Sequence, residues 1–213
     1  MMRLALPLFL ALQSTSVLAA DHLEPEHSRF EYPVAFDIFD RDDVRVLSVF
    51  KDAFEAGVRA RVIAIPSFQP EYAAGISERE GLYRIFSLHA ESQLLSNTNI
   101  RINRCEAEIA RTLGAQIITL WNLMLFETRY SQEPARGNDG VRFHFSIFYP
   151  GSSPNSGNEQ FLAEQTWSPS PTSRPGRLVV IADAMDSYCK TRNLSVLGTL
   201  DRQVNSLLTE LQR

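Results

Sequence analysis

Residues 124–146, MLFETRYSQEPARGNDGVRFHFS, bring together side chains that could take part in acid–base or nucleophilic chemistry. The polar and titratable ones are Glu127, Arg129, Tyr130, Asp139, Arg142, His144 and Ser146. A histidine titrates near neutral pH and can act as a general base when a carboxylate orients it. One hypothesis is therefore a hydrolase in which His144 is the general base and Glu127 or Asp139 orients it.

The spacing of His144 and Ser146 weighs against nucleophilic catalysis by these two residues alone. Residues two apart on a strand share a face but lie about 7 Å apart. A nucleophile and its general base need a separation of about 3 Å. The chain also has no Gly-x-Ser-x-Gly motif, which would place a serine on a nucleophile elbow.

The elements around these residues follow from hydrophobic periodicity. Apolar side chains at three- and four-residue spacing predict a long helix at about 105–130, which would end at Arg129 and Tyr130. Alternation predicts a strand at 141–148, and a second strand at 161–167 would complete a hairpin. The predicted binding surface consists of Arg129, Tyr130, His144, Ser146 and Trp167. The alternative is a structural cluster that joins the helix to the sheet.

Several short motifs follow one another in this part of the chain. They are Trp121, Met124-Leu125, Thr128-Arg129-Tyr130, the Asp139-Gly140 turn, Phe143–Ser146 and Thr166–Pro169. In this order they resemble an uncharacterised group of predicted exported bacterial proteins with no assigned activity. The resemblance covers about residues 121–169. It implies export, a single domain and a shared architecture, and it carries over no catalytic residues.

The rest of the chain adds strands and helices without regular alternation. Further strands are predicted at 34–38, 58–65 and 82–95, a loop at 67–81, and helices at 42–56, 176–190 and 196–212. This pattern predicts an α+β fold. We expect a mostly antiparallel sheet packed by the long central helix at about 105–130, with two C-terminal helices.

The first twenty residues have the layout of a secretory signal peptide. Arg3 precedes an apolar run at 4–12, and small residues end at Ala19 and Ala20. The run is too short to span a bilayer, which needs about 20 apolar residues. We therefore predict a periplasmic or secreted protein with no membrane span after signal removal. Residues 21–213 would form one globular domain, beginning with an exposed arm at 21–32.

The chain has two cysteines, Cys105 and Cys189. In an oxidising compartment two cysteines usually pair. Neither has a Cys-x-x-Cys partner or a nearby histidine, so a metal site is the weaker interpretation. We predict one structural disulfide.

The composition of the chain indicates which classes of ligand or partner the protein is not expected to bind. The formal net charge of -4 argues against nucleic acid, which needs a basic face. The four histidines form no metal-ligand motif, so no metal or cofactor is predicted. Only cleavage after Ala19 would create an Ala20-Asp21-His22 start able to hold Cu(II) or Ni(II), and the alternative there is a solvated tail.

These observations give two hypotheses of function. The first is an exported, non-enzymatic protein that binds another protein or an envelope component, in the manner of an inhibitor or immunity protein. The second is the periplasmic hydrolase that uses His144.

Overall fold

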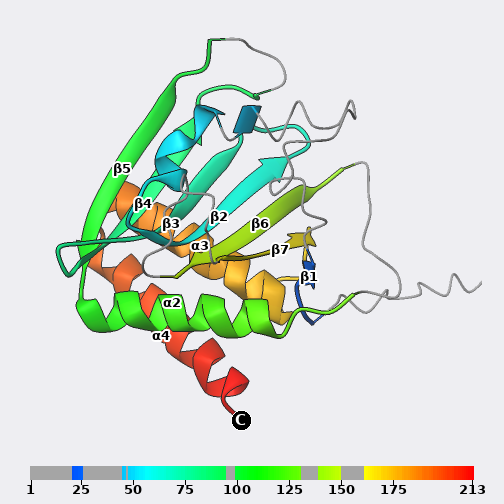
Figure 1. Cartoon of the computed structure of the whole chain (residues 1–213), viewed down its shortest axis with the longest axis vertical. Coiled ribbons are helices and arrows are strands. Elements are labelled where there is room, and N and C mark those ends of the chain that lie inside the picture. The colour runs from blue at the N-terminus through cyan, green and yellow to red at the C-terminus, as the bar shows by residue number, and fades with distance from the viewer. Residues whose placement is uncertain (1–20, 26–44, 47, 95–98, 131–138, 150–160) are drawn as a thin grey trace, which may run out of the picture.

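The computed structural model describes residues 21–25, 45–46, 48–94, 99–130, 139–149 and 161–213. These residues form one antiparallel sheet with its three long helices on one side, so the predicted α+β class is confirmed (Figure 1). The strands, in spatial order, are β1 (Glu24–Pro25), β7 (Phe161–Trp167), β6 (Val141–Phe148), β2 (Val58–Pro66), β3 (Tyr72–Arg79), β4 (Leu82–Ala90) and β5 (Ile102–Ile109). The long helices are α2 (Arg111–Phe126), α3 (Arg174–Thr191) and α4 (Leu194–Leu211).

The main core lies between the sheet and the three helices. Alternate residues of β6, namely Phe143, Phe145 and Ile147, join the buried side chains of α2, α3 and α4 in one cluster. Trp121 of α2 is fully buried there, and its indole N–H donates to the carbonyl of Arg61 over 3.2 Å. The strand predicted at 141–148 is therefore confirmed, and its alternate residues face this core.

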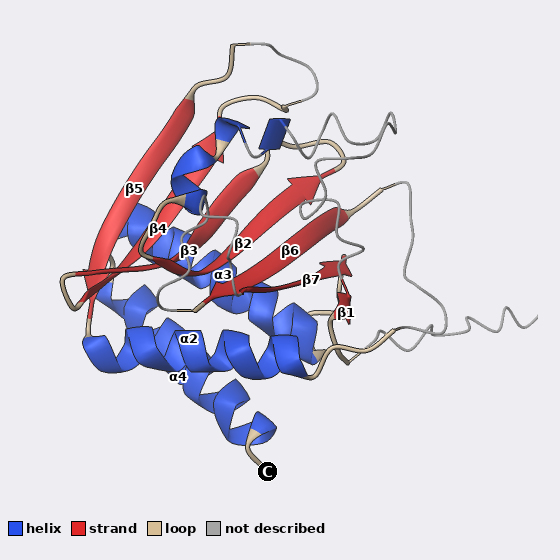
Figure 2. Ribbon diagram, in the orientation of Figure 1, coloured by secondary structure: helices blue, strands red, loops and turns tan. Residues whose placement is uncertain are grey.

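A smaller core covers the opposite face of the sheet. Phe50 and the 3-10 helix η1 (Lys51–Phe54) contact Ile63, Phe86 and Phe148 from the strands. Figure 2 shows η1 and the three long helices on opposite sides of the strands. Both faces of the sheet are therefore buried over its central strands.

The structure corrects the prediction of a helix at about 105–130. Residues 102–109 form strand β5, and α2 begins only at Arg111. Alanine and glutamate in this stretch favour helix in isolation. Pairing with β4 along the whole strand overrides that preference, because Cys105 and Ala107 lie on the helix-covered face opposite Ser87 and Ile85.

A second correction concerns residues 67–81, which were predicted to be a loop. Tyr72–Arg79 instead form β3 in the middle of the sheet. Its small residues weakened the strand signal. They are required by packing, because a side chain at Gly75 would meet the carbonyl oxygen of Ala60 and the ring of Phe86 at under 3.0 Å.

The N-terminal residues of the predicted exposed arm at 21–32 are packed against the domain. Leu23 is fully buried, and Glu24–Pro25 pair with Gln165 and Glu164 at the edge of β7. The prediction of an exposed arm is therefore wrong for these residues. The predicted signal peptide, the strand at 34–38 and the rest of the arm lie outside the described residues.

The predicted disulfide is confirmed, since Cys105 and Cys189 are bonded across 84 positions of sequence. It connects strand β5 to α3, whereas the prediction had placed Cys105 at the start of a helix. The C-terminal helices are also confirmed, and Leu200, Val204 and Leu207 of α4 are buried.

Candidate functional site

The structure places His144 and Ser146 on the side of the sheet that η1 covers. They alternate with the core residues of β6, and both are buried, at 5% and 3% exposure. Ser146 pairs with Arg61 of the neighbouring strand β2. The Arg61 guanidinium stacks on Phe54 and donates to the carbonyl of Ala53. These polar groups therefore lie beneath a second layer of the protein rather than in an open cleft.

Trp167 lies at the end of the β6–β7 hairpin, opposite Arg142. The Arg142 guanidinium carbon is 5.9 Å from the indole ring, and the hairpin register pairs His144 with Gln165. The turn before β6 is tight, because a side chain at Gly140 would meet the indole of Trp167 at 2.9 Å. The predicted hairpin that brings Trp167 to the face of His144 is therefore present.

Arg129 and Tyr130 follow α2, in the helix layer on the other side of the sheet. The Arg129 backbone N–H donates to the carbonyl of Leu23, and the Tyr130 side chain is 75% exposed. The predicted five-residue surface is thus divided between two faces. Arg129 and Tyr130 belong to one, and His144, Ser146 and Trp167 belong to the other.

The carboxylates assigned to orient His144 lie elsewhere. Glu127, also in the helix layer, accepts a hydrogen bond of 3.0 Å from the Arg174 guanidinium at the start of α3. Asp139 is exposed before β6, three positions from the strand residue Arg142. No described contact joins either carboxylate to His144.

A polar cluster that the sequence did not reveal joins α3 to the sheet. We call it the Asp186 cluster, and its members are Tyr72, Ser87, His89, Asp183, Asp186 and Lys190. Oδ1 of Asp186 lies 2.7 Å from His89 Nε2 and accepts from the Ser87 hydroxyl over 2.5 Å. Lys190 donates to Oδ2 over 2.9 Å.

Tyr72 completes the Asp186 cluster. Its hydroxyl donates to Asp183 over 2.7 Å, and its ring stacks on that of His89 with centroids 5.1 Å apart. The two rings are cross-strand neighbours, because Tyr72 pairs with His89 in the β3–β4 register. Two carboxylates one helical turn apart on α3 therefore each bind a strand side chain.

The surroundings lower the pKa of Asp186 and raise the pKa values of Asp183 and Tyr72. Burial alone raises the pKa of Asp186, but hydrogen bonds from His89, Ser87 and Lys190 outweigh it and lower that pKa to about 2. Desolvation and the charge of Asp186 raise the pKa of Asp183, although its bond to Tyr72 opposes them. Burial, and then the charge of Asp183, raise the pKa of the Tyr72 phenol.

The hydrogen-bond pattern of the Asp186 cluster limits the chemistry that it could carry out. The Ser87 hydroxyl donates to Asp186 and makes no contact with His89, so the two do not form a nucleophile–base pair. The carboxylate instead accepts hydrogen bonds from three donors. The arrangement is that of a partly buried hydrogen-bond network that holds α3 on β3 and β4.

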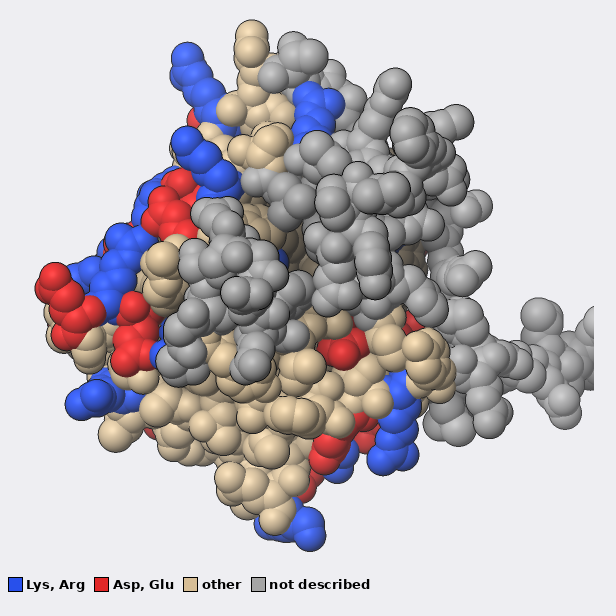
Figure 3. Space-filling model, in the orientation of Figure 1, with Lys and Arg blue, Asp and Glu red and all other residues tan. Residues whose placement is uncertain are grey.

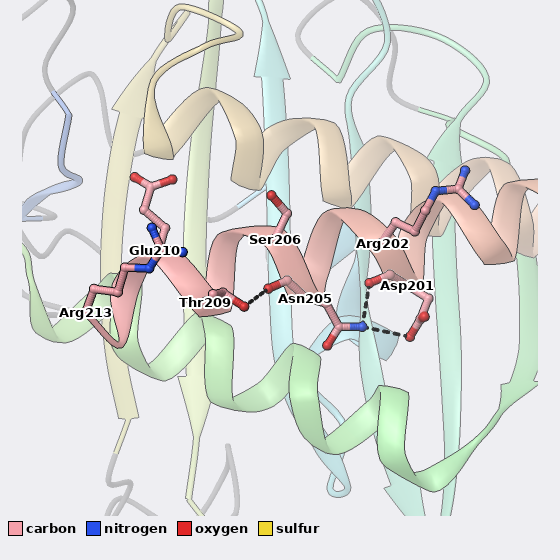
Figure 4. A pocket seen from close by; sticks show the side chains of 7 residues that line it. All are labelled: Asp201, Arg202, Asn205, Ser206, Thr209, Glu210 and Arg213. Atoms are coloured by element: carbon pink, nitrogen blue, oxygen red, sulfur yellow. Dashed lines mark hydrogen bonds between the residues drawn. The ribbon is translucent and has the colours of Figure 1, made fainter.

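A hollow of about 530 Å³ lies along α4 and is shown in Figure 4. Its lining side chains are mainly polar, and several bond to their own helix. For example, Asn205 donates to the Asp201 carbonyl over 2.9 Å, and Thr209 donates to the Asn205 carbonyl over 2.8 Å. Charges of both signs line it, so it presents no single chemistry to a ligand.

Beyond its first residue, Arg111, the exposed side of α2 lacks charge. Residues 112–126 contain no Asp, Glu, Lys, Arg or His. Thr112, Ala115, Thr119 and Phe126 are exposed along one side of this helix, and Phe126 is 66% exposed. Figure 3 shows the resulting uncharged area over α2, across the lower part of the molecule.

Within the residues that the structure describes, no group of three or more His, Cys, Asp or Glu side chains is placed to hold a metal ion. None of the described helices is both long and apolar enough to cross a membrane. Comparison with protein-family models, curated proteins and solved structures finds no match for this chain. The resemblance to exported bacterial proteins therefore stays a prediction.

Proposed function

We propose that this chain is an exported, non-enzymatic protein that binds another protein through the outer side of α2. We define this α2 surface as Ala115, Ile118, Thr119, Asn122 and Phe126 together with Arg129 and Tyr130 just beyond the helix. The observation that carries the proposal is a surface helix with no charged side chain over residues 112–126.

A helix that only separates core from solvent usually has charged residues on its outer side. The centres of protein interfaces are instead depleted of charge and enriched in aromatic residues and arginine. Phe126 and Tyr130 expose 66% and 75% of their surface at one end of this uncharged face, beside Arg129. The α2 surface thus has the composition of an interface, and it includes two residues of the binding surface predicted from sequence.

Export is supported by the N-terminal sequence and by the disulfide, which is typical of oxidising compartments. The partner would then be an exported protein or an envelope component with an uncharged contact surface. An inhibitor or immunity-type protein would work by such direct contact. The hydrolase hypothesis has no comparable support, because His144 is 5% exposed and Glu127 binds Arg174 in the helix layer on the other side of the sheet.

Site-specific cross-linking tests this proposal. A photo-reactive phenylalanine analogue replacing Thr119 should give an adduct of one defined mass in producing cells. The partner identified from that adduct should then bind the purified protein. Thr119→Arg should weaken this binding about tenfold or more, because it places an unpaired charge inside the contact.

Thr209→Arg is the matched control. Thr119 and Thr209 are both exposed helix residues, and each donates to the carbonyl four residues earlier, over 2.9 Å and 2.8 Å. The control should leave binding unchanged. Equal losses in both variants, or no adduct at position 119, would show that α2 is not the contact surface.

A further inference from the structure

Strand β5 forms one edge of the sheet over eight residues. It pairs with β4 along its whole length, and among the described residues no other strand lies beyond it (Figure 1). No backbone hydrogen bond joins its outer side to another described element. A strand edge of this length offers a row of backbone donors and acceptors to another strand.

Charged side chains on β5 restrict which strand can add there. Arg104, Glu106 and Glu108 alternate along the face that η1 covers, while Cys105 and Ala107 face the helices. Arg104 is exposed and binds Asp52 and Glu106 within the chain at 2.5 Å. A partner strand must therefore present charges in the opposite order.

We propose that a second copy of this chain supplies that strand, by antiparallel pairing of β5 with β5 across a two-fold axis at Cys105. The two seven-stranded sheets would then form one continuous sheet. An axis perpendicular to the sheet keeps the helices of both copies on one side. With this axis, residues on the same face of the two strands lie opposite each other. One residue of β5 must therefore lie directly opposite its own copy in the partner.

Charge selects this register. With the axis at Cys105, Arg104 of each copy faces Glu106 of the other, and Glu108 faces Ile102. An axis at Arg104 would place the two copies of Arg104 opposite each other. An axis at Glu106 would do the same for the two copies of Glu106. Opposite charges directly across an antiparallel pair stabilise it, and like charges destabilise it. The register at Cys105 is the one among these that makes two Arg–Glu pairs and no like-charge pair.

The interface is separate from the α2 surface, so the dimer and the proposed binding function succeed or fail independently. Sedimentation equilibrium of the purified exported protein, at concentrations up to about 100 μM, tests the dimer. The wild type should sediment as a dimer. Arg104→Glu should raise the dimer dissociation constant about tenfold or more, because two attractive pairs become two repulsive ones.

The decisive variant is the charge exchange Arg104→Glu with Glu106→Arg. It recreates both cross-strand pairs and should restore the dimer. Arg202→Glu, an exposed substitution of the same type on α4, should leave the dimer unchanged. A wild type that is monomeric at every concentration would overturn the proposal. So would a dimer that Arg104→Glu leaves intact, or one that the charge exchange fails to restore.

Discussion

At the scale of single residues, Asp186 joins helix α3 to the sheet through three polar partners. His89, Ser87 and Lys190 all contact its carboxylate, and its side chain is 17% exposed. A partly buried carboxylate with three donors is stabilised in its ionised form. Folding stability should therefore depend on the ionisation of this one residue.

We expect Asp186→Asn to lower the free energy of unfolding at pH 7. The pKa of Asp186 falls from the ordinary 3.8 to about 2 on folding. A depressed pKa stabilises the fold above the unfolded value and loses that effect as pH falls through the folded value. The difference between wild type and Asp186→Asn should thus be about 2 kcal/mol at pH 7 and shrink between pH 4 and 2.

Urea unfolding of both proteins at pH 7, 4 and 2.5 measures this difference. The raised pKa of Asp183 acts in the opposite direction. Its largest cause, desolvation, is present in both proteins, whereas the smaller contribution from the charge of Asp186 is lost in Asp186→Asn. Asp201→Asn, on the exposed side of α4, is the control and should change stability by less than about 0.5 kcal/mol at each pH. A difference for Asp186→Asn that stays constant with pH would rule out this linkage.

At the scale of the elements, glycines of α2 and α4 play different parts. Gly114 is buried where α2 crosses β4, and a Cβ there would lie 2.5 Å from Cγ of Tyr83. Gly198 on α4 would place its Cβ no nearer than 3.8 Å to another group, a flexible arginine. The first glycine allows the helix to approach the sheet, and the second has no such constraint.

Alanine at the two positions should therefore change stability in opposite directions. Gly114→Ala should destabilise the protein by about 1–3 kcal/mol, because the ring atom it meets lies close to the backbone and cannot move freely. Gly198→Ala should stabilise it by about 1 kcal/mol through helix propensity. Thermal and urea unfolding of the two variants measure both effects, and stabilisation by Gly114→Ala would contradict the close packing of α2 on Tyr83.

At the scale of the whole molecule, long-range connections anchor both ends of α3. The disulfide joins α3 to the edge strand β5. At the other end of α3, Arg174 donates to Glu127 after α2 and to Glu210 near the end of α4, each over 3.0 Å. Hydrogen bonds from Arg174, and then from Arg177, lower the pKa of Glu210. Distant parts of the chain thus meet at both ends of one helix.

Removal of the disulfide should destabilise the fold. A bond across 84 positions reduces the entropy of the unfolded chain, and the chain-entropy relation gives about 4–5 kcal/mol. Denaturant unfolding of Cys105→Ala with Cys189→Ala measures the loss. Wild type unfolded in reducing agent should show the same loss, and a loss below about 1 kcal/mol would contradict the entropic account.

Local patterns in the sequence were sufficient for several elements. Strict alternation in residues 141–148 predicted β6, and the helices predicted at 176–190 and 196–212 are present as α3 and α4. The disulfide followed because only two cysteines exist to pair. These features depend on neighbours in sequence or on simple counting, and so they need no knowledge of the tertiary structure.

Only the tertiary structure decided the rest. The small residues of β3 and the Ala–Glu residues of β5 form strands because neighbouring strands pair with them, against their local preference. The division of the predicted surface depends on which side of the sheet α2 covers. Asp186 lies 97 positions from His89, and no local signal reports that contact. The sequence alone determined the class of fold and its covalent link, and packing determined which polar side chains meet.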